Sequence, residues 1–355
     1  MAVDAVVKRH ALLVNEALLA YIPPEGPTEL TTSLRSYLAY GSKRVRPSLR
    51  VYEPIRHVVE AGGKRIRPTL CLLACEAVGG RAEQALPTAC GIEFLHTFTL
   101  VHDDIMDKDL TRRDRPTVGA LWGDDVAITA GDGLFALAMK AFADNARVPG
   151  VSADRVVRVI REAADTSLHL AQGQTMDLMQ ARRDDVRVEE YLEMIRLKTG
   201  VLLEFSLQAG ALLGGATEEE VRAFGRVGAP LGMAFQIRDD LLGLIGDPAT
   251  LGKPVGGDVK TGKRTLMAVH AMRASRDGER LAAILNTPPE KTTEEDVQEA
   301  LRIMRDAGSL DLAHRTADRY VEEAKAAIRD LPRTAGTEAL GALANLADYI
   351  LHRDR

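Results

Sequence analysis

The chain has 355 residues and a formal net charge of −5; 46% of its residues are apolar and only 4% are aromatic. A chain of this length can bury a large core, and its scarcity of aromatic residues favours helices over strands, which prefer aromatic and β-branched side chains. The negative net charge argues against general nucleic-acid binding.

Hydrophobic periodicity predicts helices along the whole chain. In order they are residues 3–21, 28–40 and 70–78, a helix with Pro87 in its first turn that runs to an acidic cluster ending at Asp107, then 125–145, a helix capped by Ser152 that reaches 183, and 188–213, 217–246, 310–331 and 335–352. Thr217 with Glu220, and Thr292 with Glu295, match the capping box of a helix start. We find no convincing strand and no domain linker, so we expect one all-helical domain of some dozen helices over residues 1–355.

The cysteines and the N-terminal residues indicate the cellular compartment in which the protein is expected. Cys71 and Cys75 lie one helical turn apart, no zinc pattern accompanies them or Cys90, and we expect reduced, buried thiols in a cytoplasmic protein. Charged residues near the N-terminus interrupt any signal-peptide core. No apolar run reaches the length of about 18 residues that a transmembrane helix needs, so no membrane span is expected.

One stretch of the chain is nearly duplicated. Residues 41–49 resemble residues 62–70, but a single pair of copies is not a solenoid repeat. The second copy leads directly into an apolar helix, and we therefore regard it as the functional one.

The most informative stretch is the acidic cluster Asp103, Asp104 and Asp107, which follows the apolar run 91–99. Residues i and i+4 share a helix face, so Asp103 and Asp107 project side by side with Asp104 next to them. Burying such carboxylates without a positive partner is costly. On this stretch alone, a solvated acidic helix end capped by the basic residues that follow is about equally plausible.

A second acidic pair, Asp239 and Asp240, follows the apolar stretch 231–234. Two such clusters at the inner ends of apolar helices suggest one shared site rather than two unrelated surface patches. Carboxylates suit Mg²⁺, which usually combines one or two of them with water and substrate phosphates. The sequence thus predicts a diphosphate held between two acidic clusters.

Basic residues complete this prediction, because Arg and Lys recognise phosphate oxygens. Each of them taken alone is more simply explained as a solvated surface residue. Together with two acidic clusters they imply two anions, one held through metal and one held directly. The candidates are Lys64, Arg65, Arg67, Arg112, Arg113, Lys198, Lys253, Lys260, Lys263 and Arg264.

These motifs, in this order, resemble the trans-isoprenyl diphosphate synthase family. The resemblance covers about residues 50–355 and leaves residues 1–50 less well matched. Each motif alone is weak, but the ordered set is strong. The matching stretches are 62–68, 102–107, Arg112-Arg113 with Pro116-Thr117, Gly131-Asp132, Gly173-Gln174 with Asp177, 198–200, Phe235-Gln236 with Asp239-Asp240, and 252–254 with Gly262-Lys263.

The resemblance implies an all-α fold around a central apolar cavity, usually homodimeric, that joins isopentenyl diphosphate head-to-tail to allylic diphosphates. It implies Mg²⁺, three ions per active site, held by Asp103, Asp107 and Asp239, with Asp104 and Asp240 beside them. Further residues match positions that hold the allylic diphosphate, namely Arg112, Lys198, Thr199, Gln236, Lys253 and Lys263. Those that match the isopentenyl diphosphate site are Lys64, Arg67, His96 and Arg113.

The expected chemistry agrees with the residue types. Cations stabilise the departing diphosphate, the alkene of isopentenyl diphosphate attacks the allylic cation, and the apolar cavity excludes water. Three departures from the family pattern stand out. Gly243 replaces a third Asp, Gly119 a frequent His, and Asp114 a frequent Gly, and Asp114 places a negative charge beside Arg113.

Product length is expected to depend on the helix that carries the first acidic cluster. Thr99 lies one turn before Asp103 and leaves the passage open, whereas Phe98 lies five residues before it, roughly 7.5 Å deeper at 1.5 Å per residue. Phe98 would then form a floor, although an ordinary core Phe is an equally good explanation. The pattern resembles archaeal-type geranylgeranyl diphosphate synthases and predicts a C20 product, with C15 (farnesyl diphosphate) as the alternative.

Three other functions are weighed against this one. A class I terpene cyclase shares the first acidic motif but usually carries a different second motif. A metal-dependent phosphohydrolase would need metal-binding His residues beyond His102. A non-catalytic subunit of a heteromeric synthase would be expected to lose the first cluster, which is intact here.

Overall fold

The computed structural model describes residues 2–22, 51–245, 256–331 and 337–351. The predicted helix 28–40, the first copy of the repeat and Lys253 lie outside these residues. The described helices are α1 (Ala2–Tyr21), α3 (Tyr52–Glu60), α4 (Ile66–Ala77), α5 (Ala82–Asp107), α6 (Val118–Trp122), α7 (Asp124–Asp144), η2 (Asn145–Arg147), α8 (Ala153–Gln180), α9 (Val188–Ile195), η3 (Arg196–Gly200), α10 (Val201–Gly214), α11 (Glu218–Ile245), α13 (Gly257–Lys260), α14 (Leu266–Ala274), α15 (Gly278–Leu285), α16 (Glu294–Asp306), α17 (Ser309–Arg329) and α18 (Thr337–Leu351).

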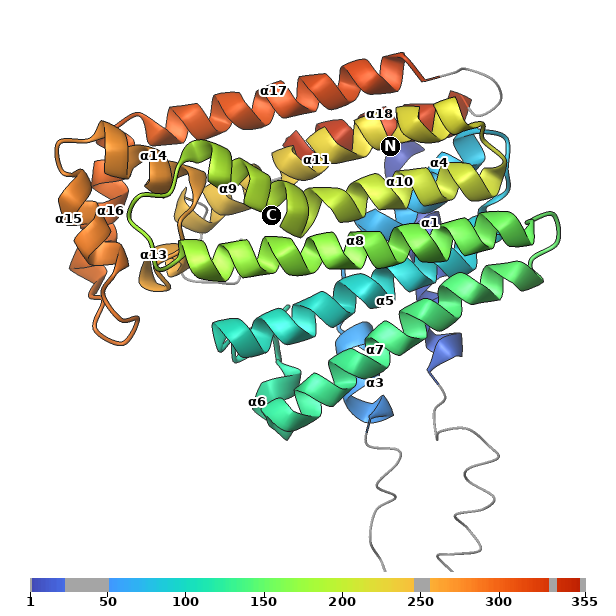
Figure 1. The fold of residues 1–355 in the computed structure, drawn as a ribbon, viewed down its shortest axis with the longest axis horizontal. Helices are drawn as coiled ribbons and strands as arrows, with labels where there is room; N and C mark the ends of the chain where they lie inside the picture. The colour runs from blue at the N-terminus through green and yellow to red at the C-terminus, as the bar shows by residue number, and fades with distance from the viewer. Residues whose placement is uncertain (1, 23–50, 246–255, 332–336, 352–355) are drawn as a thin grey trace, which may run out of the picture.

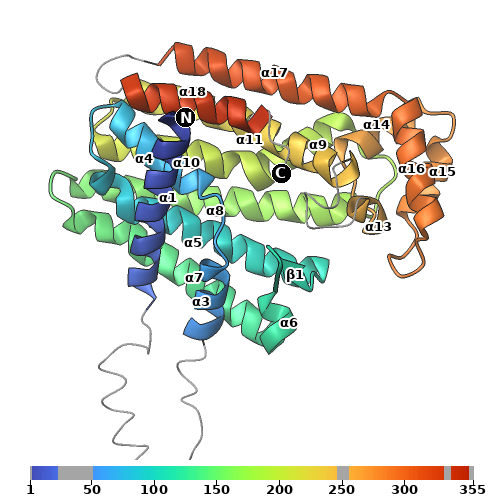
Figure 2. The same cartoon turned by 180° about the vertical axis from the view of Figure 1, so that it is seen from behind.

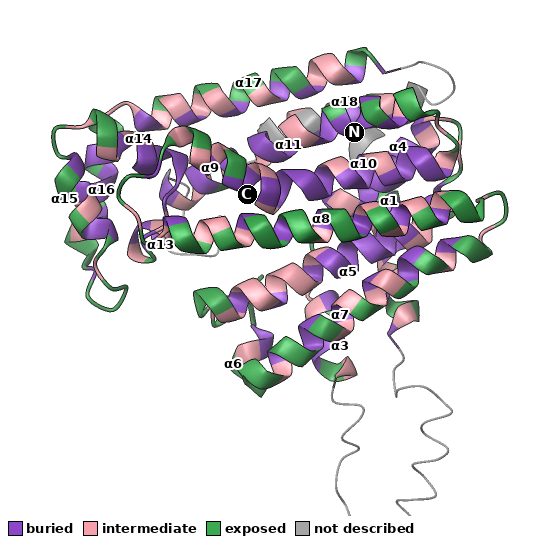
Figure 3. Cartoon of the chain, viewed as in Figure 1, coloured by how far each residue is buried: buried purple, intermediate pink, exposed green. Residues whose placement is uncertain are grey.

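The long helices lie side by side and α10 occupies the middle of the bundle (Figures 1 and 2). α10 packs against α4, α5, α8 and α11, while α11 also packs against α17. Nearly every residue of α10 is buried (Figure 3), as expected of a helix that is apolar all round. The short helices α13 to α16 gather at one end of the bundle. The predicted all-α class is therefore confirmed.

Two predicted helix starts are confirmed by their caps. Ser152 accepts a hydrogen bond from the backbone N–H of Arg155, and Thr217 with Glu220 forms the capping box of α11. Two expectations were wrong. α5 begins at Ala82, so Pro87 lies inside the helix rather than in its first turn. The capping box of α16 uses Thr293 and Asp296, one residue after the predicted pair.

The absence of strands was also predicted wrongly, because β1 (Thr111–Arg112) and β2 (Arg115–Pro116) form a short antiparallel hairpin. Its turn residues, Arg113 and Asp114, have φ angles of 53° and 59°. A two-residue turn with both φ values positive is of type I′, which prefers Asn-Gly or Asp-Gly. Arg-Asp lacks that signature, so the local sequence does not reveal the hairpin.

The predicted helix 188–213 is continuous but contains a π-helical segment, η3, between α9 and α10. α8 approaches η3 closely at Gly173, where an added Cβ would lie 2.4 Å from the backbone nitrogen of Lys198. Only glycine permits this approach. π-Helical turns are often found at functional sites, and η3 carries Lys198 and Thr199.

One described segment, Asp124–Arg147, is long and apolar enough to cross a membrane by length and composition. A single such helix is weak evidence, because core helices of soluble proteins pass the same test.

Candidate active site

A large open cavity of about 910 Å³ is lined by α4, α5, α7, α8, η3, α10, α11 and the hairpin. Asp103 of α5, Lys198 of η3 and Asp239 of α11 all contribute to its lining. The cavity thus brings together charged side chains that lie far apart in the sequence.

Asp103 lines this cavity, and burial raises its pKa to about 6 although Lys198 opposes the change. The pKa of Asp107 is also raised, chiefly by loss of hydration, and again Lys198 opposes the change. For both carboxylates, the loss of hydration on burial outweighs the attraction of the nearby positive charges, so their charged forms are disfavoured. Among the residues that the structure describes, however, no three His, Cys, Asp or Glu side chains come close enough to hold a metal ion by themselves. The predicted set Asp103, Asp107 and Asp239 is therefore not preassembled.

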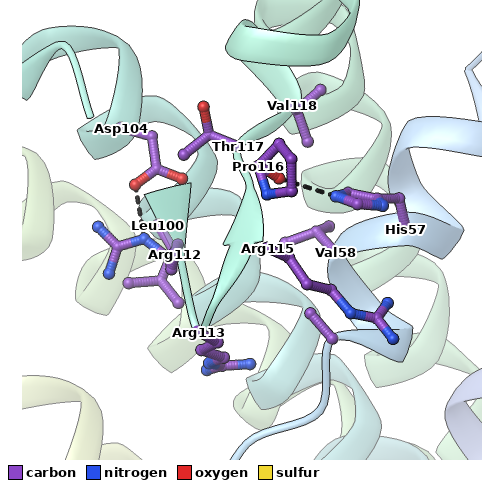
Figure 4. A pocket seen from close by; sticks show the side chains of 11 residues that line it. His57, Val58, Leu100, Asp104, Arg112, Arg113, Arg115, Pro116, Thr117 and Val118 are labelled. Carbon is purple, nitrogen blue, oxygen red and sulfur yellow. Dashed lines mark hydrogen bonds and ion pairs between the residues drawn. The ribbon is translucent and has the colours of Figure 1, made fainter. Parts of the chain in front are cut away.

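Asp104 behaves differently from its neighbours. It is buried, and Arg112 Nε donates a 2.5 Å hydrogen bond to its Oδ1 (Figure 4). Arg112 also forms a 3.5 Å ion pair with Asp109. The hairpin that carries Arg112 is held in turn by His57, whose Nε2 is 2.9 Å from the carbonyl oxygen of Pro116. Asp104 thus orients Arg112, which lines the cavity, and does not line the cavity itself.

Lys198 is held by Asp177, a residue of α8 that belongs to a matched motif but received no predicted role. Lys198 Nζ donates a 2.6 Å hydrogen bond to Asp177 Oδ2. Burial alone would lower the pKa of Lys198, but Asp177 and Asp103 outweigh it and raise the pKa. Lys198 therefore stays protonated at the cavity wall.

A hydrogen-bond chain leads from the cavity into the protein. The Thr199 hydroxyl donates to Gln236 Oε1 over 2.8 Å, and Gln236 Nε2 donates to Asp240 Oδ1 over 3.0 Å. Lys263 Nζ donates to the same Asp240 oxygen over 3.0 Å. Asp240 is only 1% exposed, so it anchors Gln236 and Lys263 from within the core.

A second pocket of about 420 Å³ adjoins the first and is lined by Lys64, Arg67, His96 and Arg113, among others. Arg67 Nη1 lies 3.2 Å from His96 Nε2. Burial, and then Arg67, lower the pKa of His96 well below its usual range, so His96 is neutral and accepts this hydrogen bond. Burial lowers the pKa of Arg67 to about 10. Within the part of the chain that the structure describes, Arg67 Nε is buried and has no hydrogen-bond partner.

Gly63 makes room for Arg113 in this second pocket. Its φ angle is 144°, and an added Cβ would lie 2.8 Å from Arg113 Nη1. The guanidinium of Arg113 therefore rests directly on the backbone of the segment that precedes α4.

Three of the ten basic candidates serve other purposes. Arg65 is buried and bonds to Glu93, Asn15 and the carbonyl of Val59. Arg264 is buried among carbonyl and side-chain oxygens, including Asp184. Lys260 pairs with Glu294. All three lie outside the lining of the larger cavity, although Arg65 contributes to the lining of the second pocket.

The deeper part of the larger cavity is apolar and contains an aromatic cluster. The Phe98 ring lies edge-on to His102 at 4.7 Å and beside Phe135 at 5.4 Å between centroids, and all three residues line the cavity. Thr99 also lines it, and its hydroxyl donates to the carbonyl of His96. Phe135 was missed in the sequence because it comes from α7, and only the packing of α7 on α5 brings it to Phe98.

The comparisons with known proteins agree with this architecture. Residues 48–304 match the family described as polyprenyl synthetase. The chain is 40% identical over 334 residues to the short chain isoprenyl diphosphate synthase of Methanothermobacter thermautotrophicus, covering 92% of this chain and 99% of that one. It is 42% identical over 299 residues to the geranylfarnesyl diphosphate synthase of Aeropyrum pernix, covering 84% and 92%.

Among solved structures, the geranylgeranyl pyrophosphate synthetase of Pyrococcus horikoshii Ot3 superposes with a TM-score of 0.85 and 37% identity over 99% of this chain and 98% of that one. The expected resemblance is thus confirmed, and the chain belongs to the polyprenyl synthetase family.

Proposed function

We propose that this protein is a trans-prenyltransferase that joins isopentenyl diphosphate head-to-tail to allylic diphosphates. The observation that carries the proposal is the shared wall of the two pockets. Arg67, His96, Arg113 and Phe235 line both of them. One anion in each pocket would bring the two organic tails together at this wall, which is the arrangement that a condensation requires.

The larger cavity would take the allylic diphosphate. Arg112, Lys198, Thr199 and Gln236 line it and would contact its oxygens. Two more lysines belong to the same proposal: Lys263, which Asp240 holds just outside the lining, and Lys253, which lies outside the described residues. The second pocket would take isopentenyl diphosphate. Its cations Lys64, Arg67 and Arg113 would pair with the phosphates, and neutral His96 would orient Arg67.

Asp103, Asp107 and Asp239 would hold Mg²⁺, three ions per active site. Their chemistry fits, because carboxylate oxygens are the ligands that this ion prefers and the raised pKa of Asp103, about 6, indicates a deficit of positive charge. Since Mg²⁺ usually completes its shell with water and substrate phosphates, a carboxylate set that is not preassembled is compatible with this role. When bound, Mg²⁺ would neutralise the diphosphate and favour its departure.

The chain's own residues would supply the remaining steps. Lys198 and Arg112, each oriented by a carboxylate, would stabilise the leaving diphosphate. The apolar cavity beyond Thr99 would keep water from the allylic cation until the alkene of isopentenyl diphosphate attacks. We expect the released diphosphate to remove the proton, so no side-chain nucleophile is needed.

We propose geranylgeranyl diphosphate, C20, as the main product, with Phe98 as part of the floor that stops elongation. The packing of Phe98 against Phe135 and His102 supports this role. The related proteins named above carry short-chain, geranylfarnesyl and geranylgeranyl names, so the product has to be measured.

We propose a cytoplasmic homodimer. Val157, Leu168 and Met179 of α8 are each more than 60% exposed, and Leu168 also lines the larger cavity. Their spacing of 11 residues is about three helical turns, which places them on one face. In this proposal a second copy of this chain would cover this face of α8.

The decisive experiment incubates the purified protein with Mg²⁺, labelled isopentenyl diphosphate and a C5, C10 or C15 allylic diphosphate. An extended prenyl diphosphate supports the proposal, and Asp103→Asn should abolish it. A diphosphate-free hydrocarbon would favour a terpene cyclase, and simple release of phosphate a phosphohydrolase. No product from any substrate would refute the synthase and favour a non-catalytic subunit.

A further inference from the structure

Asp240 is a buried carboxylate with both oxygens occupied by protein donors. Its Oδ1 accepts from Lys263 Nζ and Gln236 Nε2, each over 3.0 Å. Its Oδ2 accepts from the hydroxyl of Tyr191 over 2.6 Å. Tyr191 belongs to α9 and is completely buried. Three elements therefore meet at one side chain, namely α9, α11 and the segment before α14, and η3 is connected to it through Gln236.

The chemistry of Asp240 dictates the direction of this hydrogen-bond chain. An ionised carboxylate only accepts, and the ammonium of Lys263 supplies its counter-charge. Gln236 must therefore turn its amide nitrogen to Asp240 and its oxygen to Thr199. The Thr199 hydroxyl is then oriented by Gln236 at the wall of the cavity that it lines, and it donates to a diphosphate oxygen only by giving up this bond.

We propose that Tyr191 is a positioning residue of the allylic diphosphate site, acting through Asp240 on Lys263 and Gln236. This inference rests on the proposed prenyl transfer and adds a residue that contacts no substrate. The Tyr191 hydroxyl donates to the second oxygen of Asp240 and so opposes rotation of the carboxylate toward the cavity. With Asp240 held in place, Lys263 keeps its ammonium at a defined position and Gln236 keeps its orientation at the cavity wall.

The substitution Tyr191→Phe removes only the hydroxyl and leaves the ring packed among Met194, Ile237 and their neighbours. One Asp240 oxygen would then be buried without a partner, which favours rotation of the carboxylate or entry of water. Because Lys263 and Gln236 bond to the other oxygen, both would lose their fixed positions. The second pocket shares none of these contacts, so isopentenyl diphosphate binding should be unaffected.

The test measures kcat and the KM of each substrate for the wild type and for Tyr191→Phe, with geranyl diphosphate as the allylic substrate. We expect the KM of geranyl diphosphate to rise about tenfold, the ratio that corresponds to one weakened charged hydrogen bond. The KM of isopentenyl diphosphate should stay within about twofold. Calorimetric titration with geranyl thiodiphosphate, which cannot react, should show the same loss of affinity.

A matched control is Tyr320→Phe, since Tyr320 packs against the same hydrophobic cluster and should leave both KM values unchanged. In a double-mutant cycle, Tyr191→Phe and Lys263→Gln should be strongly non-additive, because both act through Asp240. Equal changes in both KM values, no change, or additive effects would overturn the proposal.

Thermal unfolding identifies a variant that fails to fold. In that case Asp240→Asn, which keeps the side-chain shape, replaces Tyr191→Phe and must show the same selective rise in the geranyl diphosphate KM; an unchanged KM would overturn the proposal. An inactive wild type would instead refute the proposed prenyl transfer, so the two failures are distinguishable.

Discussion

Replacement of Phe98 by Ala should lengthen the product by about one isoprene unit. Phe98 lies five residues before Asp103, a depth of roughly 7.5 Å along α5 at 1.5 Å per residue. The cavity lining continues on α5 to Leu95, three residues deeper or about 4.5 Å. One isoprene unit adds four chain carbons and spans about one helical turn of 5.4 Å, so the volume of the removed Phe98 ring together with the roughly 4.5 Å below it accommodates about one unit.

The expected main product of Phe98→Ala is therefore C25 instead of C20. Phe135 and Leu95 remain in place, so elongation should stop again after one further unit. The stability cost should lie below the 3–5 kcal/mol of a fully buried Phe→Ala change, at about 1–2 kcal/mol, because Phe98 is only half-buried and already borders open space. Fewer of its contacts are lost and no closed void is left.

The assay extends geranyl diphosphate with labelled isopentenyl diphosphate, removes the phosphates and separates the alcohols by chain length on reversed-phase chromatography. Phe94→Leu is the control, because Phe94 lies on the same helix but packs against Tyr21 in the core, away from the cavity lining. It should leave the C20 product unchanged. An unchanged product from Phe98→Ala, in an enzyme that still turns over, would refute the floor assignment.

Three further predictions concern the charged sites. Asp177→Asn should raise the KM of the allylic diphosphate about tenfold by releasing Lys198; an unchanged KM would show that Lys198 needs no anchor. Asp114→Gly should stabilise the fold by up to about 1 kcal/mol, since its φ of 59° suits glycine better, and should lower the KM of isopentenyl diphosphate by removing a negative charge beside Arg113; equal or lower thermal stability would contradict this. The lowered pKa of His96 means that the unfolded state binds the proton first as pH falls below 6.5, so the contribution of His96 to stability should decrease on acidification; the raised pKa of Asp103, about 6, acts in the opposite direction, so the wild type is compared with His96→Asn at each pH. Chemical denaturation between pH 7.5 and 5.5 tests this, and His96→Asn should weaken the pH dependence.

The local features of this protein were determined by its sequence. Helix starts such as Ser152 and Thr217 depend on a side chain that bonds within three residues, and such contacts are encoded by spacing alone. The acidic clusters could be found for the same reason, since several carboxylates at the end of an apolar helix need a positive partner wherever the helix packs. The ordered motifs were sufficient to identify the family.

Only the tertiary structure decided which carboxylate of an acidic cluster lines the cavity and which one bonds to a basic side chain. Successive helix residues differ by about 100° in direction, so Asp103 lines the cavity while Asp104 turns to Arg112. Which face of α5 borders the cavity depends on how this helix packs against its neighbours, and the spacing of residues within the helix does not determine that packing.

The same reason explains the residues that sequence reasoning missed. Asp177 and Lys198 are 21 positions apart, and Tyr191 and Asp240 are 49 apart. Phe135 reaches Phe98 from another helix. Periodicity reports which residues share a face of one element, but partners on different elements are chosen by the packing of those elements, which is a property of the folded chain.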